Sequence, residues 1–202
     1  MKLRVLTKTE LEHLYNTEMK AAFPPNELKP LSAMENLRDT GCYEPLGVFD
    51  GEELVGYALV WLQPGIPFAL LDYLGTLAGK RGGGIGAKTL DLLAQRYAGT
   101  KGVFVESEAV TAADPAEAEM QRRRLAFYER CGFRYAGYDC ALFGAHYRTL
   151  IRTECEVSAE EILQAHIAIY KNYMPAKVYS RFIQIPLAPG EKPFTPERWT
   201  EE

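Results

Sequence analysis

The sequence predicts an α/β fold of the α+β kind, in which helices flank a mixed, mostly antiparallel, twisted sheet. A hairpin pattern near residue 50 predicts antiparallel strands. A strand, a glycine turn and a helix follow one another over residues 70–97 and lead by a crossover to another β-rich run, which predicts a parallel pair. Amphipathic segments with capping residues alternate with further β-rich runs. At 202 residues the chain can bury a substantial core in one domain.

The N-terminal part predicts one strand followed by two helices. Residues 2–6 alternate loosely like an edge strand, and Thr9-x-x-Glu12 fits a capping box at the start of the first helix. Two consecutive prolines at 24 and 25 end that helix, because proline disfavours helical backbone in the residue before it. Residues 32–39 are predicted to form the second helix.

The middle of the chain predicts a hairpin and then a parallel crossover. Runs at 46–49 and 54–62 are separated by an Asp-Gly-Glu-Glu turn, which is typical of a hairpin. The apolar run 69–76 also fits a buried helical segment by periodicity alone, but the glycines after it favour a strand. A helix over 85–97 then crosses to a strand at 102–108, so the last two strands are expected to lie parallel.

The second half predicts another helix and a pair of strands. Asp114 is placed as the N-cap of this helix, with Pro115 in its first turn, and Gly132 ends it. Met120, Arg124, Phe127, Tyr128 and Cys131 are expected to share one helix face. Residues 133–142 and 146–151 follow as two strands that close the sheet.

The C-terminal part predicts a capped helix, a strand and an irregular tail. Ser158-x-x-Glu161 fits a capping box before a helix over 159–172, whose apolar face includes His166. Residues 178–187 are β-rich and predict a strand, whose edge is expected to pair with this sheet or with a second copy in a homodimer. The remaining tail is rich in proline and charge, which predicts irregular structure.

Charge and cysteine content exclude several classes of function. The net charge of −4 does not favour general nucleic-acid binding, and the one dense basic cluster is Arg122-Arg123-Arg124. We expect no membrane segment, because the N-terminus lacks an apolar stretch. Cysteines at the irregular positions 42, 131, 140 and 155 favour a reducing cytoplasm over a disulfide framework.

Five glycines crowd the eight positions after the central strand, namely Gly79, Gly82, Gly83, Gly84 and Gly86. A turn of this kind before a helix points unpaired N–H groups and the positive end of the helix dipole at one small volume, so we expect a phosphate there. A plain flexible loop also fits a glycine run. The Walker pattern fails by one residue, and the dinucleotide fingerprint does not fit either.

Two motifs together resemble the GNAT family of N-acetyltransferases. Arg81-x-x-Gly84-x-Gly86 is similar to the family's acyl-CoA pyrophosphate loop, and Tyr128-x-x-x-Gly132-Phe133 is similar to a family signature at the expected distance downstream. The resemblance covers residues from about 46 to 151 and implies the GNAT-like acyl-CoA N-acyltransferase fold. We therefore divide the chain into an acetyltransferase domain at 1–156 and a C-terminal extension at 157–202.

The resemblance implies how acetyl-CoA would bind. The pyrophosphate would lie on the turn of Arg81, Gly82, Gly83, Gly84, Ile85 and Gly86. The pantetheine arm would lie where the parallel strands diverge, beside a bulge at Leu74, Gly75 and Thr76. Gly75 suits a bulge because glycine tolerates irregular backbone. No metal is expected.

The resemblance also implies a catalytic acid. Tyr128 matches the tyrosine that many family members use to protonate the leaving thiolate, although an aromatic stripe on a helix also fits plain core packing. The position where some members carry a glutamate base is Leu70 here, which cannot take a proton. Of the nearby carboxylates Asp72, Glu106 and Glu108, we choose Glu106, acting through water. All three also fit surface groups or salt-bridge partners.

Two residues depart from the family pattern, since asparagine and alanine are usual where Gln121 and Arg124 stand. Gln121 retains an amide that can bind the cofactor. Arg124 is expected to face inward and therefore to need a partner, which would be a phosphate or Glu106. The resemblance places the early helices beside the acceptor site, but we interpret the turn with Phe23, Glu27 and Lys29 as an ordinary solvated turn.

The sequence thus predicts an acetyl-CoA-dependent N-acetyltransferase. It would transfer an acetyl group to a primary amine of a small molecule, amino acid or peptide by direct attack on the thioester. A catalytically silent acyl-CoA-binding or sensing module is the alternative, in which Arg124 distorts the site. A phosphate-binding scaffold for a nucleotide is disfavoured, because both nucleotide motifs fail.

Overall fold

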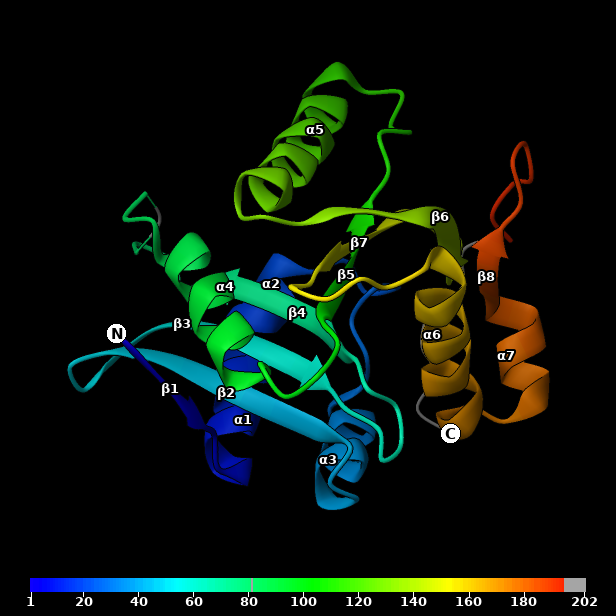
Figure 1. Ribbon diagram of the computed structural model, residues 1–202. Coiled ribbons are helices and arrows are strands. Elements are labelled where there is room, and N and C mark those ends of the chain that lie inside the picture. The colour runs from blue at the N-terminus through cyan, green and yellow to red at the C-terminus, as the bar shows by residue number, and fades with distance from the viewer. Residues whose placement is uncertain (81, 195–202) are drawn as a thin grey trace.

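Eight strands form one sheet, and helices cover both of its faces (Figure 1). The computed structural model describes residues 1–80 and 82–194. The strands are β1 (Lys2–Val5), β2 (Tyr43–Asp50), β3 (Glu53–Trp61), β4 (Ala69–Thr76), β5 (Val103–Glu108), β6 (Arg134–Leu142), β7 (Ala145–Arg152) and β8 (Ile183–Leu187). Their order in the sheet is β1-β2-β3-β4-β5-β7-β6-β8. Among these described strands β4 and β5 alone pair in parallel, which confirms the mixed, mostly antiparallel sheet.

Apart from α7 (Ala176–Phe182), the helices occur where the amphipathic segments predict them. They are α1 (Lys8–Leu14), the π-helical turn η1 (Tyr15–Met19), α2 (Lys20–Ala22), α3 (Leu31–Asp39), α4 (Ile85–Arg96), α5 (Pro115–Arg130), α6 (Ala159–Tyr173) and α7 (Ala176–Phe182). Asp114 caps α5 by accepting hydrogen bonds from two first-turn N–H groups, as predicted. Gly132 follows α5 with a φ of +84°, a backbone conformation that glycine adopts without strain.

The capping box of α1 lies two residues earlier than predicted. Thr7 is the N-cap and exchanges hydrogen bonds with Glu10, whereas Thr9 already lies inside the helix. The chain leaves β1 in extended backbone, and Thr7 is the first residue able to cap the helix after it. The helical segment ends at Phe23, whose backbone is extended because a proline follows.

The C-terminal segment packs on the same sheet as the rest of the chain. The prediction of one strand over 178–187 is wrong for its first half, which belongs to α7. Pro175 precedes α7 and supplies the fixed φ that suits a helix start. Strand β8 pairs antiparallel with β6, so it docks on the sheet of this chain through one of its edges. Of the predicted irregular tail, residues 195–202 lie outside the described residues.

Two hydrophobic cores lie on the two faces of the sheet. On one face, α1, α3 and α6 bury residues such as Leu11, Met34 and Ile169. On the other face, α4 and α5 bury residues such as Leu93 and Tyr128. The sheet therefore holds helices from the first and last parts of the chain on one side and the central helices on the other. None of the described helices has the length and apolar composition needed to span a membrane.

This packing predicts that α6 contributes strongly to stability. Ile169 is fully buried in the core, while Ile167 on the same helix is partly exposed. Ile169→Ala should lower the free energy of unfolding by about 2–5 kcal/mol, because it removes buried methylene groups and leaves a cavity. Ile167→Ala is the matched control and should change it by much less. Urea denaturation followed by circular dichroism measures both, and equal effects would contradict the docking of α6 on the sheet.

Candidate active site

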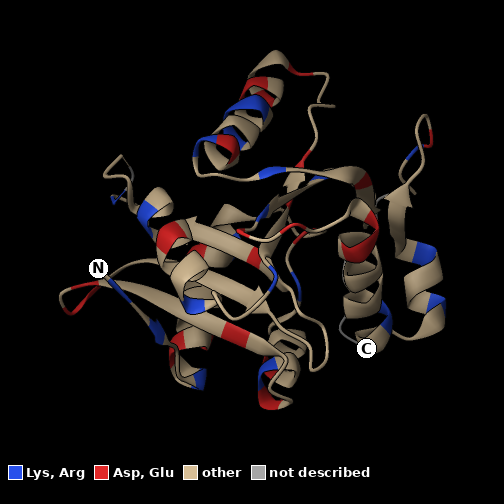
Figure 2. Ribbon diagram, viewed as in Figure 1, with Lys and Arg blue, Asp and Glu red and all other residues tan. Residues whose placement is uncertain are grey.

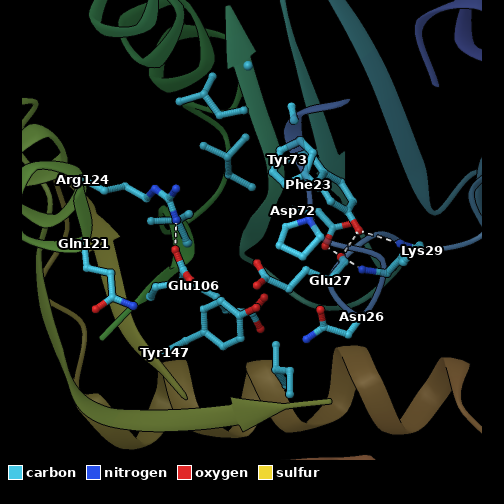
Figure 3. Close-up of a pocket in the computed structure, with 18 of the residues that line it drawn as sticks. Phe23, Asn26, Glu27, Lys29, Asp72, Tyr73, Glu106, Gln121, Arg124 and Tyr147 are labelled. Carbon is cyan, nitrogen blue, oxygen red and sulfur yellow. Dashed lines mark hydrogen bonds and ion pairs between the residues drawn. The ribbon is translucent and has the colours of Figure 1, made fainter. Parts of the chain in front are cut away.

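The site forms where the two parallel strands separate. β4 and β5 pair at Ala69 with Val103, Leu70 with Phe104 and Leu71 with Val105, and their pairing ends there. The backbone edge of β4 from Asp72 to Thr76 is therefore open toward β5. A cavity of about 660 Å³ lies at this opening, and its walls come from β4, β5, α5, β7 and the loop after α2 (Figure 3). The predicted divergence of the strands is confirmed.

A bulge in β4 accompanies the separation, but it lies at Asp72 and not at Gly75. On the β3 side, Leu71 pairs with Val60 and Tyr73 pairs with Leu59, which leaves Asp72 without a partner. Gly75 has another role, since a Cβ there would lie 2.2 Å from the Cζ atom of the Tyr57 ring. The glycine gives space to a cross-strand tyrosine. Leu74, Gly75 and Thr76 line the cavity, which is compatible with the predicted contact with the pantetheine arm. The contact itself remains a prediction.

The glycine turn leaves the start of α4 uncapped. Gly82 and Gly84 have φ values of +95° and +70°, and among the described residues no side-chain cap is formed at the start of α4. Arg81 lies outside the described residues. Gly86 differs from its neighbours, because a Cβ there would lie 3.1 Å from the Phe127 ring. It allows α4 and α5 to approach each other closely.

Helix α5 brings Tyr128 into the cavity wall, where the phenol is almost completely buried. Its ring packs edge-on against Phe127 and Phe133, with ring centroids 5.3 Å apart in both pairs. Burial raises the pKa of Tyr128 to about 12, and the charge of Arg124 opposes this shift in part. Tyr128 therefore keeps its proton at neutral pH, as a proton donor must.

Gln121 and Arg124 are held by the protein. The Oε1 atom of Gln121 accepts hydrogen bonds from the N–H groups of Thr111 and Ala112, at 3.0 and 3.1 Å, which ties α5 to the loop after β5. Arg124 pairs with Glu108, not with Glu106, and its side chain is 50% exposed. The expectation that Arg124 faces fully inward is thus wrong. Both residues line the cavity, and their contact with the cofactor remains a prediction.

The remaining cluster arginines are neutralised on α5 itself. Arg122 and Arg123 pair with Glu119 at 3.3 and 3.0 Å. Figure 2 shows acidic and basic residues next to each other along this helix. The local charge of the basic cluster is therefore offset within one turn.

Of the three carboxylates near the strand opening, Glu106 has no Lys or Arg partner among the described residues. Asp72 pairs with Lys29, and Glu108 pairs with Arg124. The Glu106 side chain is 8% exposed and accepts hydrogen bonds from His166 and Tyr170 of α6. Glu106 and Glu108, two residues apart on β5, both line the cavity. The pairing pattern supports Glu106 as the carboxylate able to accept a proton.

The loop after α2 is part of the site, so its interpretation as a solvated turn is wrong. Lys29 and Asp72 form a buried ion pair at 2.6 Å, and Tyr43 also donates a hydrogen bond to Asp72. Burial raises the pKa of the Asp72 carboxyl, although the charge of Lys29 opposes this. The phenol of Tyr73 donates to the Glu27 carbonyl at 2.7 Å. These bonds between distant residues fix the loop against β4. Local patterns in the sequence do not predict them.

Glu27 points from that loop into the cavity, on the side opposite Gln121 and Arg124 (Figure 3). Burial, and then the charge of Glu108, raise the pKa of the Glu27 carboxyl above its ordinary value. A hydrogen bond with Tyr147 opposes the shift. Glu27 and Tyr147 are thus site residues that the sequence does not reveal.

Glu106, Cys140 and His166 have potential metal-ligand atoms within 4.8 Å of one another. Both ring nitrogens of His166 are already engaged, Nε2 with Glu106 and Nδ1 with Tyr138. The group is therefore arranged as a hydrogen-bond network.

Comparison with models of known protein families assigns the chain to a family. A model of the acetyltransferase (GNAT) family matches residues 8–133, which is more than half of the sequence. The protein belongs to the GNAT family. It is accordingly an N-acetyltransferase that uses acetyl-CoA. The predicted family and fold are confirmed. A comparison with curated protein sequences finds no significant match.

Solved structures share the GNAT fold of this chain. A Bacteroides thetaiotaomicron protein assigned to the GNAT acetyltransferases has a TM-score of 0.68 at 20% identity, covering 86% of this chain and 98% of that one. An aminoglycoside 6'-N-acetyltransferase in complex with coenzyme A has a TM-score of 0.54 at 17% identity, with 78% and 99% covered. A dodecameric spermidine N-acetyltransferase from Vibrio cholerae has a TM-score of 0.55 at 12% identity, with 76% and 93% covered. At these identities the similarity shows a common fold.

The glycine turn of this GNAT protein fits a pyrophosphate. Added Cβ atoms at Gly82 and Gly84 would meet nothing within 4 Å, so the space in front of α4 is open. The uncapped first turn offers N–H groups to that space, and the helix dipole favours an anion there. Lys80, which flanks the turn, pairs with Glu53 at 2.7 Å. Backbone groups are therefore the main candidates for holding the cofactor.

A substitution at Gly83 tests this assignment without straining the backbone. Unlike Gly84, Gly83 does not have a positive φ, and an added Cβ there would meet only Ile85, at 3.9 Å. Gly83→Val should fold normally but crowd the amides, and it should raise the Kd of acetyl-CoA by about 10- to 100-fold through lost bonds to a charged group. Gly99→Val, at an open turn after α4, is the matched control. Calorimetry that gives equal affinities for both variants would contradict the assignment.

Proposed function

We propose that the protein transfers the acetyl group of acetyl-CoA to a primary amine of a small molecule, amino acid or peptide, and that the amine attacks the thioester directly. The observation that carries this proposal is the meeting of Glu106 and Tyr128 in one cavity, where β4 and β5 separate. One residue comes from β5 and the other from α5. Acetyl-CoA, when bound, supplies the activated acetyl group.

Glu106 is the proposed proton acceptor. An amine acceptor is mostly protonated near neutral pH and must lose a proton before it can attack. Of the three carboxylates near the strand opening, Asp72 and Glu108 are paired with cations, which leaves Glu106 to take this proton, directly or through a water molecule. The proton leaves the ammonium nitrogen and forms an O–H bond on the carboxylate.

Tyr128 is the proposed proton donor for the leaving thiolate. Its pKa of about 12 keeps the phenol protonated, and its place in the cavity wall brings the O–H group to the site. The phenol donates its proton to sulfur, and the attacking nitrogen loses its second proton to solvent as the amide forms. The phenolate and the protonated Glu106 then return to their starting states by proton exchange with solvent. Gln121 and Arg124 stand on the preceding turns of the same helix, where they would border the bound cofactor.

The acceptor side of the cavity is negatively charged. Burial raises the pKa of the Tyr147 phenol well above its ordinary value, and the charges of Glu27, Glu106 and Glu108 raise it further. Three carboxylates thus act on one phenol, while Arg124 offsets the charge of Glu108. Opposite charge favours the binding of a protonated amine at this wall. This supports an amine as the acceptor.

The decisive experiment measures free CoA released from acetyl-CoA with a panel of primary amines, amino acids and peptides. The proposal expects release that depends on the amine, together with a mass increase of one acetyl group on the acceptor. Tertiary amines of similar shape serve as controls, because they cannot yield a neutral amide. Tight binding of acetyl-CoA without acetylation of any amine would favour the silent binding module instead.

Replacing Tyr128 tests the role of the acid. Tyr128→Phe should lower kcat by about 10²–10⁴-fold while leaving the affinity for acetyl-CoA nearly intact, because the ring still packs but no longer donates a proton. Tyr135→Phe removes a hydroxyl from a tyrosine that is 42% exposed, and it should leave kcat unchanged. Steady-state kinetics and calorimetry measure both effects. If chemistry limits the rate and Tyr128→Phe stays within a few-fold of wild type, the acid is another group.

Glu27 provides a test of acceptor binding. Glu27→Gln should raise the KM for the amine by about 10-fold or more, since it removes a charge partner, and leave the Kd of acetyl-CoA unchanged. Because the pKa of Glu27 is raised, wild type should lose this contribution as pH falls, at a higher pH than an ordinary glutamate would. The amine KM of the variant should therefore vary less at acidic pH. Parallel KM profiles for both proteins would show that Glu27 does not bind the acceptor.

A further inference from the structure

We propose that helix α6 completes the active site and that His166 is the positioning residue for the base. In this proposal His166 fixes the rotation of the Glu106 carboxylate and turns one of its oxygens toward the acceptor. The proposal rests on the proposed role of Glu106 in the acetyl transfer. It goes beyond the family assignment, because α6 follows the residues 8–133 that the family model matches.

The contact between the two residues is short and buried. His166 Nε2 lies 2.6 Å from Glu106 Oε1, with the His166 side chain fully buried and that of Glu106 8% exposed. A buried carboxylate stays ionised only when hydrogen-bond donors replace the lost water. His166 and Tyr170, both on α6, are the donors that this chain provides.

The hydrogen bonds are compatible with the following placement of protons, which is part of the proposal. An ionised carboxylate can only accept hydrogen bonds. In this placement Nε2 of His166 therefore carries a proton and donates a hydrogen bond to Glu106. The Nδ1 atom of the neutral ring is then an acceptor, and the phenol of Tyr138 donates to it at 3.0 Å. The chain of donors runs from Tyr138 on β6, through His166 on α6, to Glu106 on β5. Every polar atom of the imidazole is satisfied in this state.

The two carboxylate oxygens of Glu106 differ in their hydrogen bonds. Oε1 accepts from both His166 and Tyr170, at 2.6 and 2.9 Å. Oε2 has a longer contact of 3.1 Å to the same Tyr170 hydroxyl, which is shared between the two oxygens. Oε2 therefore keeps lone pairs for a proton from the acceptor. The donors on Oε1 fix the rotation of the carboxylate.

His166 itself is held from several sides and does not reach the cavity. Its ring packs against Phe104 with a centroid distance of 5.1 Å and lies 5.5 Å from the ring of Tyr170. Tyr170 lines the cavity together with Glu106, whereas His166 lies behind them. A residue in this place acts on the reaction through Glu106 and not by touching the substrate.

Several titratable groups surround Glu106 and share its electrostatic environment. Glu106 raises the pKa of Asp72 and Tyr73 on β4, of Tyr138 and Cys140 on β6, of Tyr147 on β7 and of Tyr170 on α6. Glu108 on β5 and Glu27 on the loop after α2 also line this cavity, and Glu27 titrates at a higher pH than an ordinary glutamate, so the profiles are compared in proteins that keep Glu27. Among these groups, His166 and Tyr170 are those that hydrogen-bond directly to Glu106. A pH profile that changes with His166 therefore reports on this contact when the other groups are intact.

Two substitutions at His166 separate positioning from packing. His166→Leu fills much of the space but removes the donor, while His166→Gln places an amide N–H near the position of Nε2. With the best amine from the panel, His166→Leu should lower kcat by about 10- to 100-fold, because the carboxylate is no longer held in place. It should also move the acidic limb of the kcat/KM pH profile to higher pH by about one pH unit or more, since the Glu106 carboxylate loses a hydrogen-bond donor. The Kd of acetyl-CoA should stay unchanged.

His166→Gln should restore most of kcat and return the acidic limb toward its wild-type position. A folded His166→Leu protein with wild-type kcat and pH profile would overturn the proposal, and so would equal losses in both variants. If His166→Leu fails to fold, Tyr138→Phe replaces it, because removal of the donor to Nδ1 should shift the same limb. An unchanged profile in Tyr138→Phe would then count against the proton arrangement.

Glu106→Gln distinguishes failure of this proposal from failure of the proposed function. If Glu106→Gln keeps wild-type turnover, Glu106 is not the base, and His166 cannot position it. If Glu106→Gln is inactive, His166→Leu in that background should cause no further loss, because the two residues act as one unit. Additive losses would overturn the coupling.

A spectroscopic readout is independent of activity. Nitrogen NMR of the imidazole groups, assigned with His166→Gln, should show His166 as the neutral form protonated at Nε2 in wild type. In Glu106→Gln this signal should change, whereas in Tyr135→Phe it should not. The opposite tautomer, or an imidazolium form at neutral pH, would overturn the proton placement. Loss of the wild-type signal pattern after treatment with a chelator would show instead that Glu106, Cys140 and His166 hold a metal.

Discussion

The early end of the parallel pairing between β4 and β5 is the constraint on which the site depends. The two strands pair over three residue pairs and then separate, and the bulge at Asp72 shifts the register of β4 at that point. A sheet that continued to pair would fill the space now occupied by the cavity. Because it does not, the open edge of β4, the Glu106 side chain of β5 and the Tyr128 side chain of α5 all reach the same volume.

Opening the sheet exposes charged groups to a poorly hydrated interior, and the fold must compensate for this. Lys29 and Tyr43 satisfy Asp72, while Arg124 satisfies Glu108. Without such partners a buried charge is strongly destabilising, since it loses water and gains nothing in return. Lys29 and Tyr43 come from the N-terminal part of the chain, and α6 supplies His166 and Tyr170 as partners of Glu106 from the C-terminal part. This explains why the loop after α2 and the helix α6 both pack against the central strands.

The charges that remain give the cavity its chemical character. Glu106 is hydrogen-bonded to His166 and Tyr170, and Glu27 has a raised pKa because it is buried and near Glu108. A cavity of this kind is a better host for a protonated amine than for an anion, while the amides before α4 are a better host for an anion than for a cation. The first preference belongs to the cavity, and the second to the turn that follows β4. That separation matches the two substrates of an N-acetyltransferase.

The sequence by itself determined the elements whose signals are local. The apolar run of β4, the glycines before α4 and the Asp114 cap of α5 each specify backbone within a few residues, and the Tyr128-x-x-x-Gly132-Phe133 motif indicates the family. The tertiary structure alone decided what depends on distant partners. Asp72 bulges where β3 and β4 shift register, Lys29 is buried because it meets Asp72, and His166 meets Glu106 sixty residues away. Such contacts form only when the sheet brings separate segments together, so local patterns in the sequence do not encode them.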